Sequence, residues 1–277
     1  MKAAQFDYAR PASLETALAM LDGGAKPMSG GQSLGPMLNL RLARPSRVVD
    51  LGALPSMAAV LETADGIRIG AGVTHAAIED GRHAPLRGHP VQGVAAQIAY
   101  RAVRNRGTVG GSLAHADPAA DWVVVLTALG ATLTLASATG SRDVPMHAFM
   151  QGAYTTVLAD DELVAAVTVP KLDRTVCWGY DKFCRKPGEF AEASAAVLFA
   201  PGVRTARIVL GALDGPPREL AALAASIARD GAPAAARDRI LAAVREALPQ
   251  HDAVDCRLRT VCVERALARA GIGASAA

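Results

Sequence analysis

The sequence has few of the features that mark several common classes of protein. No apolar run approaches the ~18 residues that a membrane-spanning helix needs. The N-terminus, MKAAQFDYARPASLETA, lacks the apolar core and cleavage site of a signal peptide. The cysteines fit no common zinc or iron–sulfur spacing, since they lie at Cys177, Cys184, Cys256 and Cys262. We therefore expect a cytoplasmic protein with no membrane span, free thiols and no metal of its own.

Net charge and lysine are also scarce. The formal net charge is +3, and only five of the 29 basic residues are lysines. The arginines are scattered along the chain rather than clustered, which indicates a solvated surface and no nucleic-acid partner. The length of 277 residues is enough for two domains, and 51% of the residues are hydrophobic.

The first part of the chain has the pattern of a small β-α-β unit followed by antiparallel hairpins. Up to about residue 55, a helix, an extended piece, a short helix and a strand are expected at 13–21, 26–28, 34–42 and 47–51. A hairpin then follows at 58–61 and 67–70. Further helices and strands are expected at 74–78, 91–99, 131–136 and 162–169.

A second domain is expected after the stretch 170–174. Its strands are predicted at 176–183, 194–199 and 204–210, and its helices near 217–229, 234–247 and 258–270. The fold class is therefore α+β. A first domain spans 1–174, with subdomains of about 1–55 and 56–174, and a C-terminal domain spans 175–277 with a three-stranded antiparallel sheet and helices.

Two glycine-rich loops are candidates for binding phosphate. The first reads SGGQS at 29–33, and the second reads RNRGTVGGS at 104–112. Glycine lets backbone N–H groups approach an anion closely, but glycine pairs are common and either loop alone is weak evidence. Neither loop matches the P-loop or the dinucleotide-binding fingerprint.

Taken together, the two loops resemble one family. The stretch KPMSGGQSLGPMLNLRLARPSRVVDL, followed by VRNRGTVGGSLAHADPAADW, resembles the FAD-binding medium subunit of the molybdenum hydroxylases, the xanthine dehydrogenase and carbon monoxide dehydrogenase flavoprotein family. The resemblance extends to DELVAAVTVP, to GYDKFCRK and to the helical C-terminal part. It implies a two-subdomain FAD-binding domain, with the FAD pyrophosphate held by both loops.

The resemblance also implies which residues bind FAD. The first loop contributes Ser29, Gly30, Gly31, Gln32, Ser33 and Leu34, and the second contributes Thr108, Val109, Gly110, Gly111 and Ser112. Lys26 corresponds to a lysine beside the cofactor, Asp121 to an acidic residue at the adenosine end, and His115 lies on the same segment as Asp121. Leu163 and Lys182 correspond to positions near the isoalloxazine.

Two positions depart from the family pattern. Many relatives have His where this chain has Gln32, and Asn or Asp where it has Ser112. Both residues can still donate hydrogen bonds, so FAD is expected to bind. Gln32 cannot form the covalent flavin link of a related oxidase superfamily, and no cysteine is near either loop in the sequence, so binding is expected to be noncovalent.

The implied function is electron transfer within an oxidoreductase complex. The implied partners are a large molybdopterin subunit and a small subunit with two 2Fe–2S clusters, as a dimer of heterotrimers. No residue of this chain is expected to act as a general acid or base. The alternatives are a stand-alone FAD-dependent oxidase or dehydrogenase of the related fold, and a non-enzymatic scaffold whose glycine loops are only turns.

The remaining candidate residues receive more ordinary interpretations. His75, His83 and His89 are expected at the surface, because their spacing fits no metal site. Trp122 is expected to pack in the core, and 160–162 to form a solvated turn. Tyr180 either lies against the flavin or fills the core.

Overall fold

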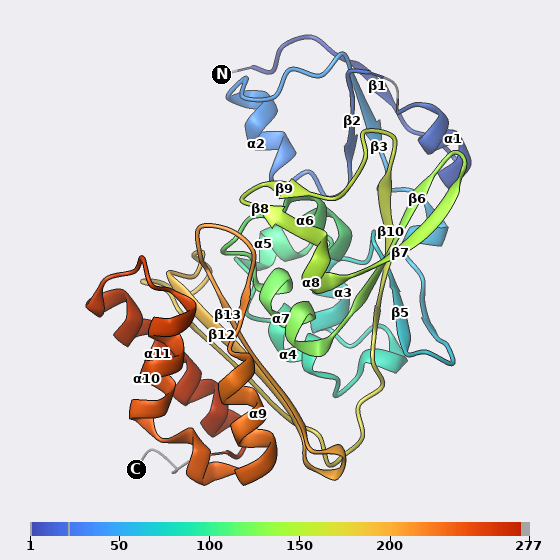
Figure 1. Cartoon of the computed structure of the whole chain (residues 1–277). Helices are drawn as coiled ribbons and strands as arrows, with labels where there is room; N and C mark the ends of the chain where they lie inside the picture. The colour runs from blue at the N-terminus through green and yellow to red at the C-terminus, as the bar shows by residue number, and fades with distance from the viewer. Residues whose placement is uncertain (1, 22, 273–277) are drawn as a thin grey trace. The chain divides into compact units, whose positions relative to one another are not determined.

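The computed structural model describes residues 2–21 and 23–272 (Figure 1). The chain divides into two compact units, an N-terminal unit of residues 1–116 with 131–170 and a C-terminal unit of residues 117–130 with 171–277. This division assigns helix α7 (Asp121–Leu129) to the C-terminal unit, although the predicted first domain at 1–174 includes it. None of the helices in the described ranges is long and apolar enough to cross a membrane.

The N-terminal unit begins with a small parallel sheet, as the β-α-β pattern predicts. Its strand order is β1-β3-β2, with β1 at Asp7–Ala9, β2 at Ala25–Met28 and β3 at Arg47–Asp50. The connecting helices are α1 (Leu14–Ala19) and α2 (Leu34–Asn39). Ser13 caps α1, because its side chain accepts a hydrogen bond from the N–H of Thr16.

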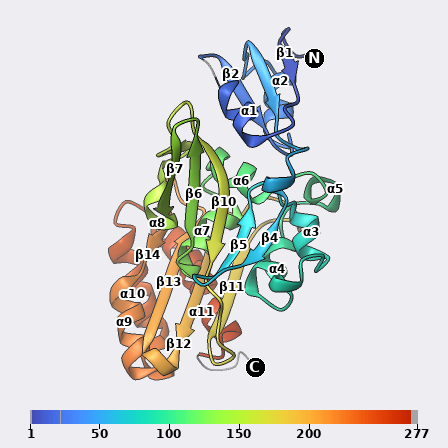
Figure 2. The same ribbon diagram turned by 90° about the vertical axis from the view of Figure 1, so that its right-hand side faces the viewer.

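The largest sheet of this unit is antiparallel and has five strands. Figure 2 shows its strands in the order β4-β5-β10-β6-β7. They span Val60–Glu62, Ile67–Gly70, Leu163–Val169, Thr132–Ser137 and Gly140–Pro145. A two-stranded ribbon pairs β8 (Met150–Gly152) with β9 (Thr155–Thr156).

Short helices join these strands. They are α3 (His75–Glu79), α4 (Pro90–Ala95), α5 (Arg101–Arg104), α6 (Val109–His115) and α8 (Met146–Phe149), with 3-10 turns at Pro55–Met57 and Ala84–Leu86. Thr74 caps α3 and Thr108 caps α6. Isolated helices of this length are not stable in water, so packing within the unit maintains them.

The C-terminal unit contains a four-stranded antiparallel sheet rather than the predicted three strands. Strands β11 (Cys177–Phe183), β12 (Ala193–Ala200) and β13 (Thr205–Gly211) are joined by the short strand β14 (Arg218–Glu219). Because β14 pairs with β13, the helix that follows this sheet begins at residue 221 instead of 217.

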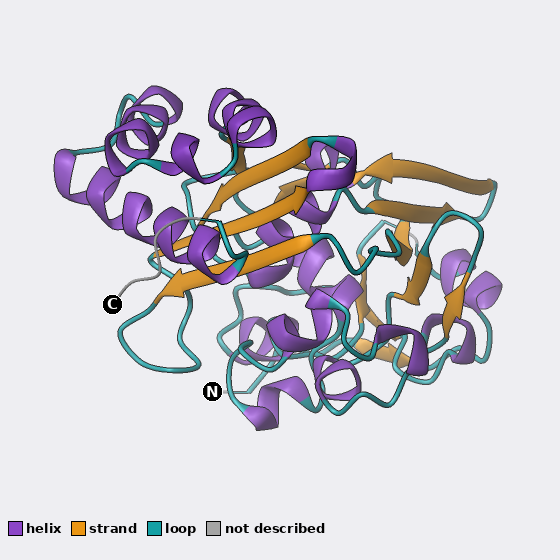
Figure 3. Cartoon of the chain, turned by 90° about the horizontal axis from the view of Figure 1, so that it is seen from below, coloured by secondary structure: helices purple, strands orange, loops and turns teal. Residues whose placement is uncertain are grey.

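Helices cover both faces of this sheet. On one face lie α9 (Ala221–Asp230), α10 (Arg237–Ala247) and α11 (Ala253–Arg269), the helices near the C-terminus in Figure 3. They enclose alternate strand residues such as Ala195, Val197 and Ile208. The intervening residues face α7: a Cβ at Gly211 would lie 2.7 Å from Cβ of Val124. A 3-10 turn occurs at Pro201–Val203 and another at Ala232–Ala235.

The histidine prediction was wrong at two positions. His75 and His89 are buried, with exposed fractions of 4% and 8%, whereas His83 is half-buried. The Nε2 atom of His89 lies 3.1 Å from the carbonyl oxygen of Pro170. Both rings are enclosed by segments distant in sequence, which a local polar pattern does not reveal.

The prediction for Trp122 is confirmed, since it is buried in the core. The stretch 160–162 is only partly a solvated turn. Asp160 and Asp161 are exposed, but Glu162 forms a two-pronged ion pair with Arg142, with N–O distances of 2.7 and 2.8 Å. All four cysteines are free thiols.

Candidate functional site

The two glycine loops lie against each other in the N-terminal unit. The hydroxyl oxygens of Ser29 and Thr108 are 2.8 Å apart. A Cβ atom at Gly30 would lie 1.9 Å from the carbonyl oxygen of Arg106, so only glycine fits at this position. The pairing of two loops predicted from the sequence therefore corresponds to direct contact in the fold.

The first loop presents a run of unused backbone donors. Within the described residues, the N–H groups of residues 30–34 donate to no protein acceptor. Gly31 has φ of +69°, a backbone conformation that residues other than glycine rarely adopt. Helix α2 begins directly afterwards, with the N–H of Gly35 bonded to the carbonyl of Gly31. Consecutive free N–H groups in such a turn are suited to binding an anion.

The second loop uses its backbone donors within the protein. The N–H groups of Val109 and Gly110 donate to the carbonyl groups of Val73 and Ala71, at 3.1 and 2.9 Å. The N–H of Gly111 donates to the side chain of its own helix cap, Thr108, at 3.0 Å. This loop therefore supports the first loop. Direct contact of residues 108–112 with a cofactor stays a prediction.

Gly110 is required by packing. A Cβ atom there would lie 2.3 Å from the Cβ of Ala71, next to strand β5. Gly110 was expected to allow the close approach of a phosphate, whereas the close approach seen here is to another segment of the chain. The Thr74–Thr108 bridge pairs the same two segments.

His75 lies beneath the second loop, and the sequence offered no signal for it. Its backbone N–H donates to the carbonyl of Gly107 at 2.9 Å, and a Cβ atom at Gly107 would lie 3.0 Å from its ring. Burial, followed by the positive charge of Arg104, lowers the pKa of His75 to about 4. The ring is therefore neutral at physiological pH and can pack under the loop.

The side chains of the first loop and of the strand before it remain accessible. Lys26 is exposed on β2, and Gln32 and Ser33 are exposed at the start of α2. Nε2 of Gln32 lies 3.4 Å from the carbonyl oxygen of Gly30. Leu34 is half-buried. Gln32, Ser33 and Leu34 belong to the same run of residues as the free N–H groups, and their contact with a cofactor stays a prediction.

Two other predicted residues are engaged elsewhere in the N-terminal unit. The ring of His115, at the end of α6, lies 5.2 Å from the ring of Tyr154, between centroids. Leu163 is buried as the first residue of β10, with 4% exposed. Their contact with a cofactor stays a prediction.

A second group of predicted residues meets in the C-terminal unit. Oδ1 of Asp121 accepts hydrogen bonds from the hydroxyl of Tyr180 at 2.6 Å and from Nζ of Lys182 at 2.7 Å. All three side chains are at most 9% exposed. Any ligand that contacts Asp121 therefore lies within reach of Lys182. Their predicted placement at opposite ends of an extended FAD does not fit this arrangement.

The same contacts show that Tyr180 fills the core, one of the two places expected for it. It is buried, and its hydroxyl is bonded to Asp121. Burial and the nearby Asp121 carboxylate raise the pKa of Tyr180 well above its usual value. The hydroxyl thus stays protonated and remains a hydrogen-bond donor.

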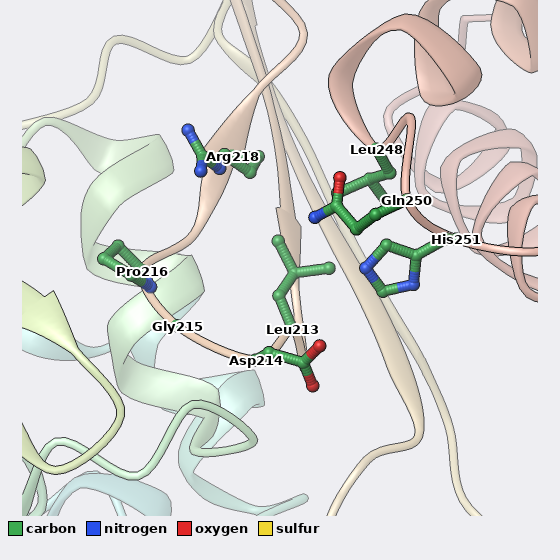
Figure 4. Close-up of a pocket in the computed structure, with 8 residues that line it drawn as sticks. All are labelled: Leu213, Asp214, Gly215, Pro216, Arg218, Leu248, Gln250 and His251. Carbon is green, nitrogen blue, oxygen red and sulfur yellow. The ribbon is translucent and has the colours of Figure 1, made fainter.

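A pocket in the C-terminal unit contains none of the predicted site residues (Figure 4). Its lining includes Asp214, Arg218 and His251. The charged side chains of Asp214 and Arg218 point away from each other in Figure 4. The pocket therefore offers no convergent set of charged groups for a ligand. In the described ranges, no group of three or more His, Cys, Asp or Glu side chains is placed to hold a metal ion.

Comparison with known proteins identifies the family of this chain. Residues 4–172 match the family described as FAD binding domain in molybdopterin dehydrogenase. The nicotine 6-hydroxylase medium subunit of Paenarthrobacter nicotinovorans is 38% identical over 224 residues, covering 78% of this chain and 77% of that protein. The carbon monoxide dehydrogenase medium chain of Hydrogenophaga pseudoflava is 34% identical and covers 70% and 69%.

The solved structures agree on the fold of the chain. Quinoline 2-oxidoreductase from Pseudomonas putida 86 matches with a TM-score of 0.86 at 31% identity, covering 98% of each chain. The chain is thus an oxidoreductase subunit with an FAD-binding domain. It belongs to the FAD-binding medium subunits of the molybdenum hydroxylases.

Proposed function

We propose that this chain binds FAD noncovalently and transfers electrons from the 2Fe–2S clusters of a small partner subunit to an external acceptor. A large molybdopterin subunit would complete the complex, as a dimer of heterotrimers. The family supports this proposal: one relative is named a medium chain of carbon monoxide dehydrogenase, and a solved structure of similar fold is a Cu,Mo-CO dehydrogenase.

The run of free N–H groups at 30–34 is the observation that carries the proposal. The FAD pyrophosphate bears two negative charges, which converging N–H groups and hydroxyls stabilise without an arginine. Gly30 packs directly against the backbone of Arg106 in the second loop and has no side chain that could come between the two loops. Bound FAD supplies the redox chemistry, and the protein supplies binding and orientation.

Noncovalent attachment follows from the side chains at the loops. The amide of Gln32 is not a nucleophile, in contrast to the imidazole or thiolate that forms a flavin link. None of the four cysteines belongs to the glycine loops, because they lie at Cys177, Cys184, Cys256 and Cys262.

Under this proposal, residues of the large molybdopterin subunit, and not of this chain, determine which organic substrate is oxidised. The substrate of the complex under this proposal is carbon monoxide, an N-heterocycle, a purine or an aldehyde. The sequence has no nicotinamide-binding fingerprint. We assign no general acid or base to the glycine loops or to the group formed by Asp121, Tyr180 and Lys182.

The experiment that tests the proposal is purification of the tagged chain from its native host. We expect two further subunits to co-purify, with molybdenum, iron and FAD in the same fractions. A monomeric yellow protein that oxidises an organic substrate unaided would instead establish the stand-alone oxidase. A colourless chain with no partners would indicate the scaffold alternative.

A further inference from the structure

Ion pairs tie the short helix that leads into the second loop to helix α3. This helix, α5, has only four residues, Arg101–Arg104, too few to be stable by itself. Nε and Nη2 of Arg104 donate to the two carboxylate oxygens of Glu79, the last residue of α3, at 2.7 and 3.0 Å. Arg101 adds two bonds to the carboxylate of Asp80, at 2.6 and 2.8 Å. Side chains at the end of α3 therefore hold α5 in place.

The pair of Glu79 and Arg104 is the more enclosed of the two. The side chain of Arg104 is 12% exposed, against 45% for Arg101. Its third nitrogen, Nη1, donates to the carbonyl oxygens of Ile98 and Ala99, at 2.9 and 2.8 Å, just before α5 begins. The hydrogen bond from Arg104 lowers the pKa of Glu79, so the carboxylate is ionised at physiological pH.

The position of α5 determines the position of the backbone on which the first loop rests. The carbonyl of Val103 accepts hydrogen bonds from the N–H groups of Arg106 and Gly107, at 3.0 and 2.7 Å. The carbonyl of Arg106 is the group against which Gly30 packs. At the first residue of α3, the N–H of His75 donates to the carbonyl of Gly107 at 2.9 Å. Both ends of α3 therefore hold the segment that leads into the second loop.

We propose that Glu79 and Arg104 are positioning residues of the cofactor site, whose ion pair holds the backbone at Arg106 so that the first loop keeps its free N–H groups in the arrangement that binds the FAD pyrophosphate. This inference rests on the proposed function, since it takes FAD as the ligand of the first loop. All of these residues belong to the N-terminal unit. The effect passes through the contact of Arg106 with Gly30, and a loop held in its binding arrangement loses less conformational entropy when the ligand binds.

The ion pair also contributes to the stability of the fold, so the test must separate stability from positioning. A variant that is only less stable keeps the wild-type affinity for FAD as long as nearly all molecules remain folded. A variant whose first loop is displaced loses affinity although it is folded. The dissociation constant of FAD, measured on the folded full-length apoprotein, therefore distinguishes the two roles.

The first variant is Glu79→Gln, which removes the negative charge that faces both arginines and changes the size of the side chain little. We expect it to weaken FAD binding by about 10-fold. In the flavin-free protein, trypsin should cleave after Arg104 or Arg106 faster than in the wild type, because the segment opens more often without the ion pair.

Arg82→Gln is the matched control. Arg82 pairs with Asp80 at the same end of α3, but it is 65% exposed and does not belong to α5. Its replacement should change neither the affinity for FAD nor the rate of cleavage after Arg104 and Arg106.

A second variant covers the case in which Glu79→Gln does not fold. Arg104→Lys keeps a positive charge beside Glu79, but an ammonium group cannot bridge both carboxylate oxygens and the two backbone carbonyls, so it should also weaken FAD binding. Unchanged FAD affinity or unchanged cleavage in a folded variant, or an equal loss of affinity in Arg82→Gln, would overturn the inference. Failure of the wild-type chain to bind FAD would instead contradict the proposed function, and the cleavage rates would still test the ion pair.

Discussion

Gly30 is the residue at which the fold and the proposed site constrain the sequence most strongly. In Gly30→Ala the new Cβ would lie 1.9 Å from the carbonyl oxygen of Arg106, so the first loop must move away from the second. We expect this variant to lose FAD, because the N–H groups of residues 30–34 would no longer keep their arrangement. The measurement is the flavin content of the purified protein.

Gly35→Ala is the matched control for this prediction. It lies in the same segment, and its added Cβ would meet no atom within 4 Å. We expect it to retain FAD. Loss of flavin in both variants would mean that the segment tolerates no substitution, and retention in both would contradict the role of the first loop.

His75 predicts a pH dependence of stability. Its pKa is about 4 in the folded protein and 6.5 in the unfolded chain, so the unfolded state binds the proton first as the pH falls. Stability is therefore unaffected by this group above pH ~6.5 and decreases between pH ~6.5 and ~4. From pH 7 to 5, the wild type should lose about 2 kcal/mol more than His75→Gln.

Urea unfolding followed by circular dichroism at both pH values measures this difference. His147→Gln is the control, because His147 is exposed and its replacement should leave the wild-type pH dependence unchanged. An identical loss of stability in His75→Gln and the wild type would show that His75 is not the titrating group.

Some roles depend only on neighbours along the chain. Ser13, Thr74 and Thr108 each cap the helix that they directly precede. The burial of His75 against Gly107 and the bond between Tyr180 and Asp121 could not be anticipated. The residues of each pair are 32 and 59 positions apart in the sequence, and only folding brings them together. Burial reflects tertiary packing, which a local pattern does not encode.

At the scale of elements, the contact of α7 with β13 makes a prediction for the C-terminal unit. Gly211→Ala would place a Cβ 2.7 Å from Cβ of Val124 and 2.6 Å from Oγ of Ser194. Overpacking of this kind costs ~1–3 kcal/mol of stability. We expect the unfolding midpoint in urea to decrease, with Gly215→Ala as a control that meets no atom within 4 Å.

Tryptophan fluorescence is the appropriate measurement for this variant. Both tryptophans of the chain, Trp122 and Trp178, lie in the C-terminal unit, on α7 and β11. Their fluorescence therefore reports unfolding of the unit that contains the substitution. An unchanged midpoint in Gly211→Ala would mean that α7 shifts on the sheet without cost.

Most elements were predictable because their signals are local. The hairpin of β4 and β5 has a turn with Gly66, and β10 ends at Val169, directly before Pro170. The boundaries were less predictable: α11 begins at residue 253 rather than 258, because Asp252 caps it by accepting from two backbone N–H groups. Strand β14 has two residues, too few for an alternating pattern.

At the scale of the whole molecule, each compact unit is built from two separate segments of the chain. Helix α7 lies before the predicted boundary at 174 but packs on the sheet of the C-terminal unit, through contacts such as Gly211 with Val124. The order of segments along a chain does not reveal that a helix packs in a unit whose other elements come later in the sequence. The family, in contrast, was evident from two motifs, because each is a contiguous stretch.

The most direct test of the account is the flavin content of the purified full-length chain after acid precipitation. We expect stoichiometric FAD, released into the supernatant because no residue of the loops forms a covalent bond with it. A chain that cannot be loaded with FAD, or one whose flavin stays in the precipitate, would contradict the central claim that the loop at 29–34 holds FAD noncovalently.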